Sequence, residues 1–353
     1  MSQINLSRPA KIRTFMLGTA VFLVPPQRTQ RAILLILLLL AVLFYLSLAL
    51  GKQGIDNPWL ATSTHYQEFI LTQLRLPRAL VAIGAGATLA LSGSLFQLTT
   101  RNALGSPDII GVNAGAAAGI VTTLIIWPGV FPVALGALLG ASFAVLLVYA
   151  GNISASGQMQ TTRIVISGIA IAALCMAFVN FAISNVRLEQ AQQLASLLHG
   201  SLANRRWQDV GLIYGTMILF VPLLLWLGRQ LNYVNLGYEV ANTLGVPVRI
   251  IQLMSLSLAV ILASMAVLVV GPVAFIALSA PQIARRLVRA KGTALFCSAL
   301  VGALLLLASD LMTLLLPTSA RLPIGVITAG VGGVYLMYLL YAELRRTKSC
   351  HSI

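Results

Sequence analysis

Acidic residues are scarce in this chain of 353 residues, where eight Asp and Glu stand against 23 Lys and Arg. Cysteine and histidine are rarer still, with three of each. No CxxC pair and no HExxH motif occurs, and the three histidines lie far apart in the sequence. The chain therefore lacks both a disulfide framework and the ligand spacing of a metal site, so we predict no metal bound by its side chains.

A nucleotide-binding loop is missing as well. No GxxxxGK[ST] motif occurs, so the chain has no loop of the kind that cradles ATP phosphates. The run "GAGATLALSG" begins like a dinucleotide-binding motif, but Leu89 stands where the third glycine belongs and no strand precedes it. We therefore predict that this chain binds no cofactor and is not itself an enzyme.

Apolar residues are abundant. Hydrophobic residues make up 58% of the chain, charged residues only 9%, and the mean hydropathy is +0.92. Such a composition is typical of a chain that lies in lipid. Because a transmembrane helix needs about 20 apolar residues, the length allows roughly ten spans with short loops. The predicted spans are 32–50, 76–98, 108–127, 130–150, 161–184, 209–229, 248–270, 273–289, 293–316 and 323–342.

The basic residues indicate an orientation. With the N-terminus inside, 16 of the 23 Lys and Arg fall on the inner side and seven on the outer side. This asymmetry predicts that both termini are cytoplasmic. It also accounts for the net charge of +15 without a nucleic-acid partner, because the charges are scattered over loops and no soluble domain carries them.

Three regions follow from these spans. Residues 1–31 form an N-terminal segment whose run "FMLGTAVFLV" is too short to span and has no cleavage site, so we expect it to be cytoplasmic or interfacial. Residues 32–342 form the transmembrane domain, and residues 343–353 form a cytoplasmic tail.

Small residues recur on the predicted spans and favour close packing of helices in lipid. The second span carries Ala82, Gly86, Ala90 and Ser94, and the third carries Gly111, Gly115 and Gly119; further glycines are Gly136, Gly140, Gly325 and Gly333. These stripes predict a tightly packed bundle and no particular chemistry.

Asp310 is the single acidic residue well inside a predicted span. A charge there costs roughly 2.5 to 3.5 kcal/mol on insertion scales. A structural role, with the carboxylate bonded to hydroxyls such as Ser309 or Thr313 or to a helix end, is one interpretation. A mechanistic role is the other, although no relay partner at membrane depth is evident.

The inner loop 231–249 is too polar to span and too regular for a linker. Leu236, Val240 and Leu244 repeat every four residues, with Gly237 and Gly245 as breaks, which predicts a short amphipathic helix. It lies either on the membrane surface or against a cytoplasmic partner. The second reading favours a membrane subunit energised by a partner over a channel or secondary transporter.

Several motifs resemble the FecCD/BtuC-type permeases, the membrane subunits of binding-protein-dependent ABC importers for iron chelates, haem and vitamin B12. They follow the family order from about residue 75 to 340. The matching pieces are "RLPRALVAIGAGATLALSGSLFQ", "RNALGSPDIIGVNAGAAAG", "GSLANRRWQDV", "LGYEVANTLGV", "GPVAFIALSAPQIARRL" and "LPIGVITAGVGGVYLMYLL". Two positions depart from the family pattern: Pro281 is followed by Gln282 where Pro-His is usual, and Leu197 stands where a tryptophan is frequent.

The resemblance implies an all-α polytopic membrane protein with about ten transmembrane helices, a BtuC-like type II ABC importer permease of the bacterial inner membrane. Its implied partners are two cytoplasmic ATPase subunits that hold ATP and Mg, a second permease subunit that is identical or homologous, and a periplasmic or lipid-anchored binding protein. The sequences of these motifs are most similar to those of siderophore permeases, with the ferric catecholate group first and ferric citrate next. Haem or vitamin B12 is the alternative cargo.

Residue roles follow from the same resemblance. Arg75, Arg78 and, less directly, Arg321 would meet acidic residues of the binding protein, although snorkelling to lipid headgroups is the alternative for the first two. The coupling helix, about residues 236–246, would contact the ATPase through the apolar residues above, with Glu239 at the rim. Neutral residues Asn113, Ser167 and Asn180 would line the translocation path, unless they bond between helices.

Overall fold

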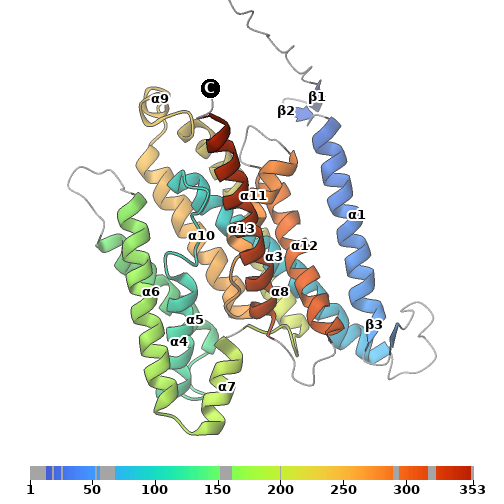
Figure 1. The fold of residues 1–353 in the computed structure, drawn as a ribbon, viewed down its shortest axis with the longest axis vertical. Coiled ribbons are helices and arrows are strands. Elements are labelled where there is room, and N and C mark those ends of the chain that lie inside the picture. Colours follow the sequence, from blue (N-terminus) through green and yellow to red (C-terminus); the bar gives the residue numbers. More distant parts are fainter. Residues whose placement is uncertain are drawn as a thin grey trace, which may run out of the picture.

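A computed structural model of the chain describes residues 13–17, 20–24, 27–51, 54–55, 68–151, 161–198, 200–288, 294–316 and 323–350. Helices dominate this part of the chain (Figure 1). They are α1 (Gln27–Ala49), η1 (Ile70–Arg75), α3 (Leu76–Thr100), α4 (Val112–Ile126), α5 (Val133–Ala150), α6 (Thr161–Ser184), α7 (Leu188–Leu198), α8 (Trp207–Val234), α9 (Tyr238–Thr243), α10 (Val248–Val270), α11 (Ile276–Val288), α12 (Leu295–Leu315) and α13 (Ile324–Cys350).

Two short strand pairs accompany α1. Strand β1 (Arg13–Leu17) pairs antiparallel with β2 (Ala20–Val24), and β3 (Leu50–Gly51) pairs with β4 (Gly54–Ile55). The first pair falls within the N-terminal segment 1–31, whose apolar run we expected to be too short to span. Its described residues form paired strands.

The prediction of an all-helical, polytopic membrane fold is confirmed, because a helix occupies each of the ten predicted spans. Six helical stretches among the described residues are long and apolar enough to cross a membrane, and three shorter apolar helices accompany them. The stretches are Thr29–Ala49, Ile70–Thr100, Arg163–Ser184, Trp207–Val234, Val248–Val270 and Leu295–Leu315. Several bounds differ by a few residues, and α13 continues as a helix over most of the predicted tail. Helix α7 and the turn η1 lie outside every predicted span.

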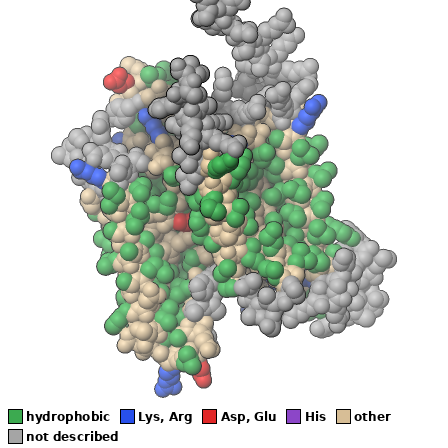
Figure 2. All heavy atoms as spheres, in the orientation of Figure 1, with side chains coloured by type: hydrophobic (Ala, Val, Ile, Leu, Met, Phe, Trp, Pro, Cys, Tyr) green, Lys and Arg blue, Asp and Glu red, His purple; other side chains and the backbone are tan. Residues whose placement is uncertain are grey.

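The central element is α3. In the apolar 18-residue window of the stretch Ile70–Thr100, 89% of the residues are buried inside the protein, whereas 17% are buried in the corresponding windows of α1 and of α6. Helices α8, α10, α11 and α12 pack against it. The exposed flanks of the outer helices are apolar, and Figure 2 shows hydrophobic side chains over most of this face, with Lys and Arg near the two ends. This distribution suits a bundle surrounded by lipid.

Glycines allow the closest helix contacts. A Cβ at Gly86 of α3 would collide with the carbonyl oxygen of Gly302 on α12, and one at Gly119 of α4 would collide with that of Gly136 on α5. Gly115 approaches Gly140 across the same α4–α5 pair. The predicted packing through small-residue stripes is therefore confirmed for these pairs.

Candidate functional site

Helix α9 protrudes at one end of the bundle (Figure 1). Gly237 precedes it with φ +129° and Gly245 follows it with φ +77°. Glycine adopts such positive φ values readily, whereas residues with a Cβ rarely do. The regular helix is therefore only six residues long, shorter than the predicted range 236–246. Ala241, completely buried, fixes α9 against the bundle, and α9 contacts both α8 and α10.

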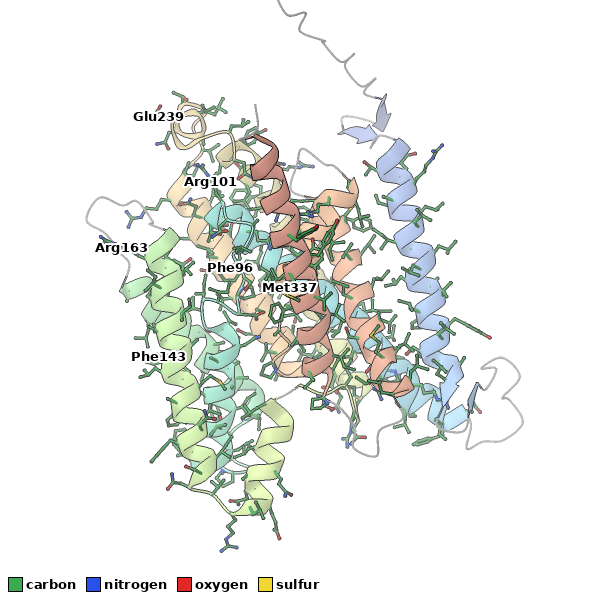
Figure 3. All side chains as sticks on the ribbon, in the orientation of Figure 1. Phe96, Arg101, Phe143, Arg163, Glu239 and Met337 are labelled. Carbon is green, nitrogen blue, oxygen red and sulfur yellow. The ribbon has the colours of Figure 1, made fainter. Side chains whose placement is uncertain are left out.

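Three apolar side chains around α9 face outward. Leu236 is 65% exposed, Val240 46% and Leu244 59%. Glu239 is exposed beside them and marks the tip of this end in Figure 3. The predicted apolar face thus exists as a surface that the chain itself leaves uncovered, and its contact with an ATPase stays a prediction.

Arg101 ties this end to the centre of the bundle. It follows α3 in a left-handed conformation, φ +50°, and its Nη2 donates a hydrogen bond to the carbonyl oxygen of Val234, the last residue of α8. Figure 3 shows Arg101 on the same side of the molecule as Glu239. The loop that carries α9 is therefore attached directly to the end of α3.

The opposite end of α3 carries an ion pair that crosses to α12. Arg78 Nη2 lies 2.7 Å from Asp310 Oδ1, and Arg78 Nε lies 2.9 Å from Asp310 Oδ2, a bidentate geometry. The same guanidinium donates to Thr313 Oγ1 at 3.4 Å. The side chain of Asp310 is 1% exposed and that of Arg78 is 25% exposed, so the acid is buried and its partner reaches towards the surface.

This pair corrects the expected partners of Asp310. The Ser309 hydroxyl donates to the Leu305 carbonyl at 2.8 Å, and the Thr313 hydroxyl donates to the main-chain carbonyl of Asp310 at 2.6 Å. Both hydroxyls thus serve main-chain carbonyls of their own helix, as is common for Ser and Thr in helices. The carboxylate is instead neutralised by Arg78, which lies 232 positions away in the sequence.

The remaining predicted docking residues have different surroundings. Arg75 Nη1 donates to the carbonyl oxygen of Leu48 on α1 at 2.7 Å, so this guanidinium also has a contact inside the protein. Arg321 lies outside the described residues. Docking of a binding protein by these arginines stays a prediction.

The three predicted path residues do not form one cluster. Asn113 Nδ2 donates to Asp108 Oδ1 at 2.6 Å at the start of α4, while Ser167 Oγ donates to the carbonyl of Arg163 in its own helix at 2.8 Å. Asn180 is exposed on α6, thirteen residues beyond Ser167 and therefore about 20 Å along the helix. Asn113 lies on α4 while the other two residues lie on α6, and a place for them on a translocation path stays a prediction.

A polar cluster that we did not predict joins α3, α11 and the turn after α3. Gln97 Nε2 donates to the Leu278 carbonyl at 2.9 Å, and Arg285 Nη2 donates to Gln97 Oε1. Gln282, one of the two departures from the family pattern, donates to the Ala103 carbonyl at 2.6 Å. An amide N–H at this position therefore holds α11 to the turn that leads into α4.

Metal ligands do not gather in the described part of this bundle. Over the residues that the structure describes, no three His, Cys, Asp or Glu side chains lie together as a metal ion would require. The described residues provide close helix contacts, a buried ion pair and an exposed apolar surface on α9. These features define a multi-spanning helical membrane protein.

The comparisons with known proteins identify the family. The FecCD transport family matches residues 34–342, and the chain belongs to this family. Among curated relatives, the ferric enterobactin transport system permease protein FepG of Escherichia coli (strain K12) is 36% identical over 278 residues, which cover 78% of this chain and 84% of FepG. The Fe(3+)-citrate import system permease protein YfmE of Bacillus subtilis (strain 168) is 35% identical, over 91% of this chain and 97% of YfmE.

A solved structure supports the same fold. An inward-facing ABC transporter described as of the metal-chelate type superposes with a TM-score of 0.78 at 27% identity, covering 89% of this chain and 99% of that chain. The PsaBC complex of Streptococcus pneumoniae, at 15% identity and a TM-score of 0.51, shows likeness of fold alone.

Proposed function

We propose that this chain is the permease subunit of a binding-protein-dependent ABC importer that moves a ferric siderophore across the bacterial inner membrane. The exposed apolar surface of α9 carries the proposal, because Leu236, Val240 and Leu244 would be costly to leave in water and suit a groove on a cytoplasmic ATPase. The ferric enterobactin and ferric citrate permeases among the relatives support the siderophore class, with ferric catecholates first and ferric citrate next.

Energy would enter at α9. The chain has no phosphate-binding loop of its own, so ATP and Mg would be held by two partner ATPase subunits. Movement of α9 would reach α3 through the Arg101–Val234 contact and reach α8 and α10 through their direct contacts with α9. ATP hydrolysis would thereby change the opening of a path on the permease.

A second permease subunit, identical or homologous, would complete that path. Helices α6 and α13 pack loosely and expose many large apolar side chains, which suits a subunit interface as well as lipid. Asn113, Ser167 and Asn180 would then lie along or beside the passage, where neutral polar groups would let a hydrophilic chelate pass without holding it. On the opposite face, a periplasmic or lipid-anchored binding protein would deliver the cargo.

A proton-coupled secondary transporter is the competing function. Asp310, the acid predicted from the sequence to lie well inside a span, is paired bidentately with Arg78 in a buried position, which favours a structural role for its carboxylate. The pairing of Asp310 therefore fits an ABC importer better than a proton-coupled transporter.

Reconstitution tests the two functions directly. Proteoliposomes would contain the chain, its second permease subunit and the ATPase, with ATP inside and a loaded binding protein outside. We expect uptake of radiolabelled ferric siderophore only when ATP, ATPase and binding protein are all present, and parallel assays with ferric citrate, haem and vitamin B12 define the cargo. Uptake by the chain alone under a proton gradient would refute the importer.

A further inference from the structure

A pocket lies between η1 and the start of α8, at the end of α8 far from α9. Its volume is about 460 Å³, within the range of small-ligand sites, roughly 300–1,000 Å³. Two arginines, Arg205 and Arg206, line it together with Trp207, Phe69 and Gln73. We propose that this pocket binds the phosphodiester headgroup of a membrane phospholipid.

The wall formed by η1 is held in place by an aromatic side chain. In this π-helical turn the Leu76 N–H bonds to the carbonyl of Leu71, five residues earlier, so the main-chain bonding is shifted from the α-helical pattern. Trp207 Nε1 donates to the carbonyl of Thr72 at 3.1 Å. This bond joins η1 to the first residue of α8 across 135 positions of sequence and fixes the two sides of the pocket.

The side chains of the two arginines differ in how firmly hydrogen bonds hold them. Arg205 is half-buried, and its Nε and Nη2 both donate to the Ser201 carbonyl, at 3.2 and 2.8 Å, which sets the plane of the guanidinium. Arg206 is exposed, and its main-chain N–H donates to Asp209 Oδ2 at 2.9 Å. Arg205 therefore presents a fixed charge, and Arg206 can turn its fork onto a phosphate.

Charges of both signs surround the pocket. Asp209 and the exposed Glu68 are the acids nearest to it in sequence, beside the two lining arginines. In a headgroup with phosphate and amine, the phosphate can pair with the arginines and the amine with the acids. In a headgroup with phosphate and neutral glycerol, only the arginines find a charged partner. The recognised chemistry is the phosphodiester, so phosphatidylethanolamine and phosphatidylglycerol are both candidate ligands.

The position of the pocket favours a lipid over a soluble acidic partner. On α8, exposed apolar residues begin at Leu212 and continue through Ile218 and Leu219, which marks a surface that faces hydrocarbon. Leu212 lies five residues beyond Trp207, so the pocket is about 7.5 Å from the start of this surface, at the depth of headgroups. Trp207 itself is 43% exposed there, as is typical of aromatic residues at the membrane interface.

The test is a lipid titration of the purified full chain. Delipidated protein would be titrated with phosphatidylethanolamine and with phosphatidylglycerol, and bound lipid would be counted by native mass spectrometry. In Arg206→Gln we expect the apparent affinity of the tightest lipid to fall about tenfold, because a charge-assisted bond to the phosphate is lost. Arg187→Gln is the matched control, since Arg187 is exposed at the same end on the turn between α6 and α7 and should leave lipid binding unchanged.

Each other outcome overturns the proposal. Equal lipid affinity in the two variants would show that Arg206 does not hold a headgroup. Displacement of the tightest lipid by millimolar inorganic phosphate would identify a free-anion site instead. Weaker capture of the binding protein by Arg206→Gln, with lipid binding intact, would make the pocket a protein contact. None of these readouts requires transport, so they are independent of the importer's cargo.

Discussion

The ion pair between Arg78 and Asp310 makes a quantitative prediction about stability. In Arg78→Gln, the carboxylate of Asp310 stays buried at 1% exposure without a counter-ion. Removing one partner of a buried pair costs about 3 to 5 kcal/mol, because an uncompensated charge is left in a medium of low polarity. We therefore expect Arg78→Gln to lower the free energy of unfolding by an amount in this range.

Substitution of the other partner, Asp310, should destabilise the protein less. In Asp310→Asn the remaining charge is that of Arg78, which is 25% exposed and can turn its guanidinium towards water. The expected loss is about 1.5 to 3 kcal/mol, the size of a hydrogen bond to a charged group. The double variant should lose less than the sum of the single variants, because neither charge is then left alone.

The assay is reversible unfolding of the purified chain in mixed micelles, with the four variants measured side by side. Arg187→Gln, which removes an exposed arginine, sets the background. Two results would refute the reasoning: a loss in Arg78→Gln no larger than this background, or additive losses in the double variant. Either would mean that the pair in the structure contributes nothing to folding.

Three further predictions concern coupling, packing and docking. Leu244→Asp places a charge in the apolar surface of α9 and should abolish ATP-driven uptake, whereas the control Asn242→Asp should preserve uptake. Normal uptake by Leu244→Asp with the ATPase still bound would show that another loop couples the ATPase to the permease. Gly86→Val should destabilise the chain in a thermal melt by several times more than Gly215→Val, because a Cβ at Gly86 collides with α12 while nothing lies within 4 Å of Gly215. Arg75→Glu should weaken binding-protein affinity and reduce its salt dependence, and unchanged affinity at low ionic strength would leave only the contacts of Arg75 inside the protein.

Helices that carry an uninterrupted apolar run were predicted well from the sequence. The bounds of α6 and α10 coincide with the predicted spans 161–184 and 248–270, since polar or turn residues end each run sharply. Helix α7, residues "LEQAQQLASLL", was missed because half of it is polar and it has no hydropathy signal for a span. Its amphipathic pattern is the signal that identifies it.

Side-chain partners were harder to predict because they depend on tertiary contacts. The sequence singled out both Arg78 and Asp310, but hydropathy cannot show that residues 232 positions apart meet at one depth of the bundle. The expected partners of the Asp310 carboxylate, neighbouring hydroxyls or a helix end, were therefore wrong, because its partner is Arg78. The indole contact of Trp207 with Thr72 was missed for the same reason, since it depends on an irregular turn that no periodicity reveals.

The uneven burial of the helices determines which parts of this protein can move. Helix α3 is enclosed by α8, α10, α11 and α12, and its glycine contact with α12 leaves no space for sliding. A displacement that begins at α9 must therefore carry these helices together as one rigid block. Helices α1 and α13 pack on α11 and α12 of that block, whereas α6 packs on α4 and α5. The apolar windows of α1 and α6 are only 17% buried, so rearrangement at the peripheral helices costs least free energy. A change of conformation would then appear as rotation of the block formed by α3, α8, α10, α11 and α12 relative to the peripheral helices. Crosslinks between helices of this block would not prevent that change.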